Sequence, residues 1–315
     1  MSPPPADLVP AAFVQHVRGL PPEGGPSGED WARALPGLLG ELLAQWELRP
    51  DGPSRFGNCA LVVPVAGADL SRGAALKVGW PHRETATEHL ALRHWSGRGA
   101  VQLLRADPAR GALLLERLTT EDLTEMWDEE ACHIVGALYR DLHVRPFAQA
   151  PRLSDWARRQ SEALGALADV GAHGGRPALP PRMVTHARSL IEELVGDPDC
   201  DAALVHSDLH YENVLSDGTD WVAIDPKPMA GHPAFEVAPM LWNRTEEMGT
   251  GPGFRYLLRR RAEVLCETAG LEWDAVRDWS IVRETVNAMW AAQDGGEGAQ
   301  HRVGLAVTII KALGD

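Results

Sequence analysis

Hydrophobic residues in the first third of the chain occur mainly in short runs of strand length. A helix-like segment at 31–46 precedes four such runs, which are CALVVPV, GAALKVGW, VQLLRAD and ALLLERL. Turn signals separate them at 66–73 and in DPARG. One helix, at about 84–95, interrupts the series and offers apolar residues for burial. The pattern predicts a small sheet-rich lobe over residues 1–118, of which 1–30 are expected to be partly flexible because they are rich in Pro and Gly.

After residue 119 the hydrophobic spacing becomes helical. Apolar residues recur at intervals of three and four in EACHIVGALYRDLH, SLIEELVG, FRYLLRRRAEVLCETAG and the segment from Val303. The arginines at 259–261 are expected on the solvated side of a helix. Only one strand pair is expected here, NVLSDG with WVAID, joined by a turn at Asp217 and Gly218. Residues 119–315 are thus predicted to form a larger helical lobe, and the whole chain an α+β fold.

Composition excludes several classes of protein. With 44% hydrophobic and 23% charged residues, the chain is typical of soluble globular proteins. Its four cysteines form no CxxC pair, so we expect neither a disulfide framework nor a structural zinc site, and a cytoplasmic location fits. No secretion signal or membrane-spanning run is evident. The net charge of −14 argues against nucleic-acid binding and favours cationic ligands, although it could serve solubility alone.

The most informative segment is LVHSDLHYENVLSDGTDWVAIDP, at 204–226. It contains His206-x-Asp208 and, five residues after Asp208, Asn213; a hairpin then returns the chain to Asp225. This is the spacing of a kinase catalytic loop followed by a metal-binding aspartate. Phosphoryl transfer needs a carboxylate at the acceptor hydroxyl, the role we assign to Asp208, and oxygen ligands for Mg²⁺, here Asn213 and Asp225. His206 is expected to brace the loop through hydrogen bonds.

The other lobe should hold the nucleotide. Lys77 lies between apolar neighbours in a strand, where it could bind the phosphates of ATP. Either Glu84 or Glu88 could pair with it, and the residues alone do not decide between them.

Further nucleotide contacts are weaker predictions. Ser54 and Asn58, in DGPSRFGN, could cover the phosphates, although there is no GxGxxG and a plain turn is the alternative. Backbone groups from Glu116 to Leu118 could bind the adenine edge, a prediction that rests on position alone.

With these residues identified, the chain resembles the aminoglycoside phosphotransferases, and within them the branch of streptomycin 6-kinases and hydroxyurea phosphotransferases. The matching segments include AALKV, LLLERL, HSDLHYENVL, WVAIDPKPMAGHPAFEVA and MWAAQDG. The resemblance implies a bilobal protein-kinase-like fold, ATP and Mg²⁺, and transfer to a small-molecule hydroxyl, with resistance to the antibiotic as the result. It also implies that Glu84 is the lysine's partner in this branch, and Glu88 in the wider superfamily. Three residues depart from the family pattern: Ser207 stands where relatives often carry Gly or a larger residue, His232 where they usually carry an acidic residue, and Glu236 where Asp is common.

The acceptor is the least defined part of the prediction. A cationic antibiotic such as streptomycin would need acids and aromatic rings, whereas hydroxyurea is small and neutral. The candidate substrate residues are Trp290, Asp294, Glu246 and Trp242, each of which could equally be ordinary surface or core. Another small metabolite, such as an amino sugar, is a further alternative.

Two rival classes remain. His206, Asp208 and His232 could form the two-histidine, one-carboxylate site of a non-haem iron oxygenase, but Lys77 and Asn213 would then have no explanation. A catalytically silent binding protein with a kinase fold is the other rival, and the complete motif argues against it.

Overall fold

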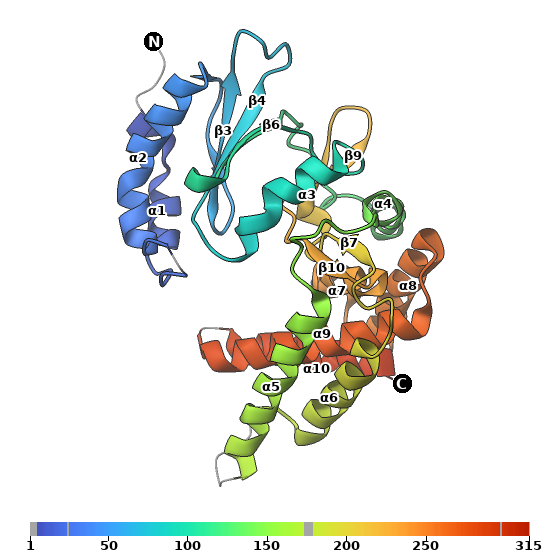
Figure 1. Ribbon diagram of the computed structural model, residues 1–315. Coiled ribbons are helices and arrows are strands. Elements are labelled where there is room, and N and C mark those ends of the chain that lie inside the picture. The colour runs from blue at the N-terminus through green and yellow to red at the C-terminus, as the bar shows by residue number, and fades with distance from the viewer. Residues whose placement is uncertain (1–4, 24, 173–178, 297, 315) are drawn as a thin grey trace. The chain divides into compact units, whose positions relative to one another are not determined.

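A computed structural model describes residues 5–23, 25–172, 179–296 and 298–314, and the chain divides into two compact units (Figure 1). The first unit consists of residues 1–120 and 216–222, and the second of residues 121–215 and 223–315. The division at 120 is close to the boundary expected after residue 118. That the hairpin tip at 216–222 belongs to the first unit was not evident from the sequence.

The first unit is built on a six-stranded antiparallel sheet of order β1-β3-β4-β6-β5, with β2 also paired to β3. Its strands are β1 (Arg49–Pro50), β2 (Arg55–Phe56), β3 (Ala60–Ala66), β4 (Ala74–Gly79), β5 (Leu103–Asp107) and β6 (Ala112–Glu116). The four predicted runs are β3 to β6. In β3 the fully buried residues alternate, because successive side chains of a strand point to opposite faces.

Helices complete the core of this unit. They are α1 (Ala11–Val17), α2 (Gly28–Gln45) and α3 (Glu88–Trp95). Figure 1 shows α1 and α2 side by side along the sheet, and their apolar residues share one core with β3 and β4. Phe13 and Val17 are fully buried. Within the segment expected to be partly flexible, α1 thus packs its apolar side chains into the core.

The second unit is mainly helical. Its helices are α4 (Asp128–Leu142), α5 (Leu153–Ala172), α6 (Pro181–Val195), α7 (Ala238–Trp242), α8 (Gly251–Ala269), α9 (Trp273–Asp294) and α10 (Ala299–Gly314). α9 packs along α10, α4 along α8, and α5 along α6. None of the described helices combines the length and the hydrophobicity that a membrane span requires.

The arginine run in α8 does not lie on a solvated face. Arg261 is buried, donates to the carbonyl oxygens of Met240 and Asn243 at 2.7 Å, and pairs with Asp128 at 2.9 Å. Arg259 donates to the carbonyl oxygen of Ala312 at 2.7 Å. The expectation was wrong because α8 packs against both α4 and α10, so more than one of its sides is covered.

Two strand pairs, and not the single one expected, occur among the described residues after 119. The predicted hairpin pairs β8 (Val214–Ser216) with β9 (Trp221–Ala223). In addition, β7 (Ala203–Val205) pairs antiparallel with β10 (Met229–Gly231). The segment with the candidate catalytic residues begins directly after β7 and ends directly before β10. Its two ends are therefore held together by backbone pairing.

Candidate active site

His206 follows β7 and is fully buried. Its Nε2 lies 2.9 Å from the carbonyl oxygen of Ile224, and its Nδ1 accepts from the backbone N–H of Asp208 at 3.3 Å. Because a carbonyl can only accept, Nε2 must carry the ring proton and the imidazole is neutral. Burial lowers the pKa of His206 to about 4, in agreement with a neutral ring. The His206 ring thus links the backbone N–H of Asp208 to the backbone carbonyl of Ile224, the residue before Asp225.

A buried carboxylate from outside the motif also holds this loop. Glu236 Oε1 accepts from the backbone N–H groups of His206 and Ser207, the second at 3.2 Å. Tyr139 donates its hydroxyl to the Glu236 carbonyl at 2.9 Å, which positions the residue. Burial raises the pKa of Glu236 to about 7, against the lowering effect of the two N–H donors.

Ser207 has an unusual backbone conformation, with φ = +63°. This left-handed region favours glycine, because a side chain beyond the α-carbon is crowded there. The serine side chain offsets the cost, since its Oγ donates to the carbonyl of Lys227 at 2.5 Å. Arg283 of α9 donates to the Ser207 carbonyl at 2.9 Å. Ser207, which precedes Asp208, is therefore fixed through its side chain by Lys227 and through its carbonyl by Arg283.

Asn213 is placed with its amide oxygen available to a ligand. Its Nδ2 donates to the Asp208 carbonyl at 2.8 Å and lies 3.1 Å from Nε2 of His210, which uses both amide hydrogens. No described residue donates to Oδ1. The backbone N–H of Ile224 donates to the Asn213 carbonyl at 2.9 Å, so the residue before Asp225 lies beside Asn213.

Asn213 and Asp225 are better suited to binding Mg²⁺ together with phosphates than to forming a metal site whose ligands all come from the protein. An amide oxygen and the exposed carboxylate of Asp225 are hard oxygen ligands, as Mg²⁺ prefers. Among the described residues there is no group of three or more His, Cys, Asp or Glu side chains that could hold a metal. Mg²⁺ characteristically takes only one or two carboxylates from protein and completes its shell with phosphates and water. Asn213 and Asp225, with one amide oxygen and one carboxylate, fit this mode of Mg²⁺ coordination.

The arrangement does not support an iron site. Both ring nitrogens of His206 are engaged with the backbone, and Nδ1 of His232 accepts from the backbone N–H of Ala234 at 3.1 Å. The predicted alternative of two histidines and Asp208 on one iron therefore has no geometric basis here.

Asp208 forms an ion pair that the sequence did not indicate. Its Oδ2 lies 2.6 Å from Nζ of Lys227, with exposed side-chain fractions of 20% and 38%. The pair remains accessible to a ligand. Two signals in the sequence could have pointed to Lys227: it stands two residues after Asp225, and the chain contains only three lysines.

In the first unit, Lys77 and Glu88 form a buried ion pair. Nζ of Lys77 in β4 lies 2.6 Å from Oε1 of Glu88, the first residue of α3. Of the two partners considered from the sequence, Glu88 is thus the one for which the structure shows an ion pair. The side chain of Glu84 lies outside the described part of the chain.

The remaining nucleotide candidates also lie in the first unit. Oγ of Ser54 is buried without a hydrogen-bond partner among the described residues, and Asn58 is exposed between β2 and β3. The backbone N–H of Glu116 donates to the carbonyl of Gln102 at 3.0 Å, because β6 extends through this residue. That N–H is therefore engaged within the sheet, and the adenine contact expected of the backbone groups from Glu116 to Leu118 stays a prediction. Leu118 follows the strand end and is partly buried.

Aromatic side chains from several elements of the second unit lie beside Arg283 of α9 or pack in contact with one another. The guanidinium of Arg283 lies 4.3 Å from the ring centroid of Phe235 and 4.9 Å from that of Trp242. Trp156 of α5 packs edge-on against Phe235 at 5.3 Å and against Trp290 at 6.5 Å. Trp290 itself is 47% exposed. Trp156 was missed from the sequence because nothing near it carries a motif.

The other substrate candidates differ in what they contact. Trp242 is half-buried, and Arg283 lies against its ring, so stacking on a ligand would require displacing that contact. Asp294 pairs with Arg302 at 3.0 Å at the surface, and Glu246 is exposed on a short 3-10 helix. Among the four, Trp290 combines an exposed ring with a chain of contacts to the catalytic loop. That chain runs through Trp156, Phe235 and Arg283 to Ser207.

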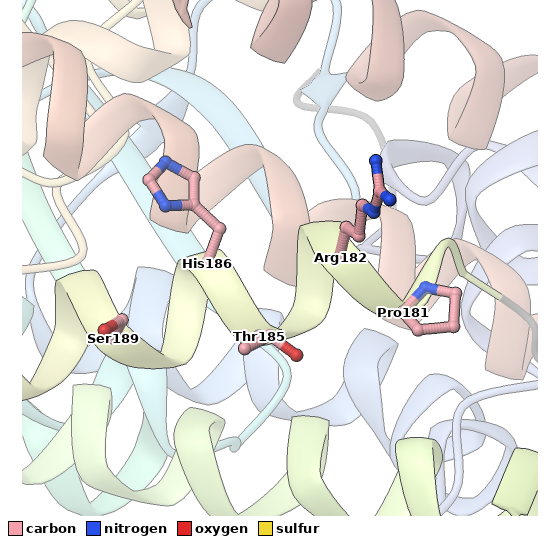
Figure 2. A pocket seen from close by; sticks show the side chains of 5 residues that line it. All are labelled: Pro181, Arg182, Thr185, His186 and Ser189. Carbon is pink, nitrogen blue, oxygen red and sulfur yellow. The ribbon is translucent and has the colours of Figure 1, made fainter.

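A surface pocket of about 450 Å³ lies elsewhere in the second unit. Figure 2 shows that the lining side chains all come from α6, namely Pro181, Arg182, Thr185, His186 and Ser189. All five are exposed, and none belongs to the site described above. The pocket therefore adds nothing to the chemistry of the loop.

Comparison with known proteins gives a consistent result. The family described as aminoglycoside/hydroxyurea antibiotic resistance kinase matches residues 45–295. A streptomycin 6-kinase from Streptomyces glaucescens is 37% identical over 301 residues, which cover 92% of each chain. A hydroxyurea phosphotransferase from Kitasatospora aureofaciens is also 37% identical, covering 86% of this chain and 77% of that one.

Solved structures show the same fold at low sequence identity. A choline/ethanolamine kinase family protein from Mesorhizobium loti has a TM-score of 0.58 at 16% identity, covering 83% of this chain and 88% of that one. Aminoglycoside phosphotransferase APH(4)-Ia has a TM-score of 0.55 at 16% identity, covering 87% and 97%. The predicted α+β protein-kinase-like fold is confirmed, and the chain belongs to the aminoglycoside/hydroxyurea antibiotic resistance kinase family.

Proposed function

We propose that the protein transfers the γ-phosphoryl group of ATP to a hydroxyl of a small antibiotic, in the cytoplasm and with Mg²⁺. The observation that carries this proposal is the loop from His206 to Lys227, in which Asp208 is accessible and Asn213 presents a free amide oxygen. The family provides independent support for an antibiotic as the acceptor.

Each residue of the loop then has a specific task. Asp208 accepts the hydroxyl proton while the acceptor oxygen bonds to the γ-phosphorus and the bond to ADP breaks. Asn213 Oδ1 and the Asp225 carboxylate would hold Mg²⁺, whose charge offsets that of the phosphates. His206 and Glu236 keep the loop backbone in place through the contacts described above. Lys77 would bind phosphate oxygens, with Glu88 holding its ammonium.

We propose a cationic aminoglycoside, such as streptomycin, as the preferred acceptor. Trp290 lies seven residues after Arg283 on α9, about two helical turns from the side chain that bonds to Ser207. An exposed indole at this position can stack on a guanidinium or a sugar ring of the acceptor. Hydroxyurea is the second candidate, because the relative named for it is as similar to this chain as the streptomycin kinase is.

The test is an ATP-consumption screen of purified protein over streptomycin, other aminoglycosides, hydroxyurea and amino sugars, with each phosphorylated product confirmed by mass. Asp208→Ala should abolish transfer while leaving ATP affinity nearly unchanged, and Asp220→Asn, an exposed acid of the same hairpin, serves as control. Trp290→Ala should raise the KM for an aminoglycoside by about 2- to 30-fold and leave that for hydroxyurea unchanged. Turnover by Asp208→Ala would refute the assigned role, and a screen without any product would refute the substrate class.

A further inference from the structure

Lysine is rare in this protein, and two of its lysines form ion pairs with carboxylates: Lys77 with Glu88 in the first unit, and Lys227 with Asp208 in the second. The chain has 30 Lys and Arg residues, and only Lys77, Lys227 and Lys311 are lysines. Arginine therefore supplies almost every other cationic side chain. A compact ammonium differs from a planar guanidinium in size and in the geometry of its donors. Lys77 has an assigned partner and task, whereas Lys227 has no task in the proposed mechanism.

The backbone of Lys227 is fastened to the catalytic loop. Its N–H donates to the carbonyl of His206 at 3.0 Å, and its carbonyl accepts from Oγ of Ser207 at 2.5 Å. Two residues later, Met229 pairs with Val205 in the β10–β7 sheet. These contacts involve only the backbone of Lys227, so they can persist when its side chain is replaced.

The side chain extends to the catalytic carboxylate. Nζ of Lys227 lies 2.6 Å from Oδ2 of Asp208, and 38% of the lysine side chain is exposed. No described residue hydrogen-bonds to Oδ1 of Asp208, which leaves that oxygen for an acceptor hydroxyl. A hydroxyl on Oδ1 places its phosphorylated oxygen within a few ångströms of the lysine ammonium.

On the basis of the proposed function, we propose that Lys227 is a catalytic residue that orients Asp208 and binds an oxygen of the transferred phosphoryl group. In the transfer, the acceptor oxygen forms a bond to phosphorus, the bond to the β-phosphate oxygen breaks, and its electron pair leaves with ADP. The hydroxyl proton passes to Asp208. Lys227 exchanges no proton; its positive charge stabilises the negative charge on the equatorial phosphoryl oxygens.

Substitution separates this role from a structural one. Lys227→Met should lower kcat by about 10²- to 10³-fold, measured both for antibiotic phosphorylation and for ATP hydrolysis to water. Its urea midpoint should be unchanged, because the backbone contacts of Lys227 remain. Lys227→Arg should recover part of kcat, and Lys311→Met, at an exposed position on α10, should match the wild type. A Lys227→Met variant with kcat within threefold of the wild type would overturn the proposal.

A spectroscopic measurement does not depend on turnover. With ¹³C-labelled lysine, the intact protein should give three Cε signals, assigned by the arginine variants of each lysine. The Lys227 signal should shift in Asp208→Asn and again in the wild type on addition of Mg²⁺ and a non-hydrolysable ATP analogue, while the Lys311 signal stays in place. If the chemical shift of Lys227 Cε does not change when the nucleotide analogue is added, the proposal is overturned. If no antibiotic is phosphorylated, ATP hydrolysis and this signal still test Lys227 separately from the substrate class.

Discussion

Replacing Glu236 tests how strongly the catalytic loop depends on one buried carboxylate. Oε1 accepts from two backbone N–H groups, those of His206 and Ser207, and the side chain is fully buried. A buried donor left without a partner costs about 1–3 kcal/mol, so Glu236→Ala should destabilise the second unit by about 2–6 kcal/mol. The amide oxygen of Glu236→Gln can accept both bonds, and this variant should lose less than about 1.5 kcal/mol.

The pH dependence of stability gives an independent measurement. Burial raises the folded-state pKa of Glu236 from 4.5 to about 7. Between these values the folded state binds more protons than the unfolded state, so stability falls as pH rises through that range, by at most about 1.4 kcal/mol per pH unit. Glu236→Gln cannot titrate, and its stability should be flatter with pH.

Urea unfolding followed by tryptophan fluorescence measures both effects, with kcat measured on the same samples. We expect kcat of Glu236→Ala to fall by about 10- to 100-fold, because a loosened loop misplaces Asp208. The reasoning would be refuted if the alanine and glutamine variants were equally stable, since the two hydrogen bonds would then contribute nothing.

Three further predictions follow from buried or strained groups. Burial raises the pKa of Glu284 from 4.5 to about 8, so the wild-type protein should lose stability as the pH rises from 4.5 to 8. Glu284→Gln cannot titrate, and its urea midpoint should fall less than that of the wild type over the same range. Ser207→Gly should be more stable than Ser207→Ala by about 1 kcal/mol, because both lose the bond to Lys227 but only glycine relieves φ = +63°; equal urea midpoints would contradict this. Glu88→Gln leaves the ammonium of Lys77 buried and poorly compensated, and should cost about 3–5 kcal/mol in thermal or urea unfolding.

Local pattern and spacing were sufficient for much of the fold and for the chemical core of the site. The four strand runs became β3 to β6 because a short hydrophobic run bounded by turn signals is a local feature of the chain, and in β3 burial also alternates along the run. The offsets from His206 to Asn213 and the following hairpin are equally local. The loop could therefore be located before any coordinates were known.

The partners of these residues depended on packing between distant segments. Glu236 reaches the loop from about thirty positions away, the buried Arg261 lies between helices, and Lys77 pairs with Glu88 across the turn that precedes α3. Lys227 meets Asp208 only because β7 and β10 close the segment between them. The sequence by itself determined which chemical groups are present and their local geometry. Only the tertiary structure decided which of them meet, because desolvation and ion pairing depend on neighbours that folding brings together.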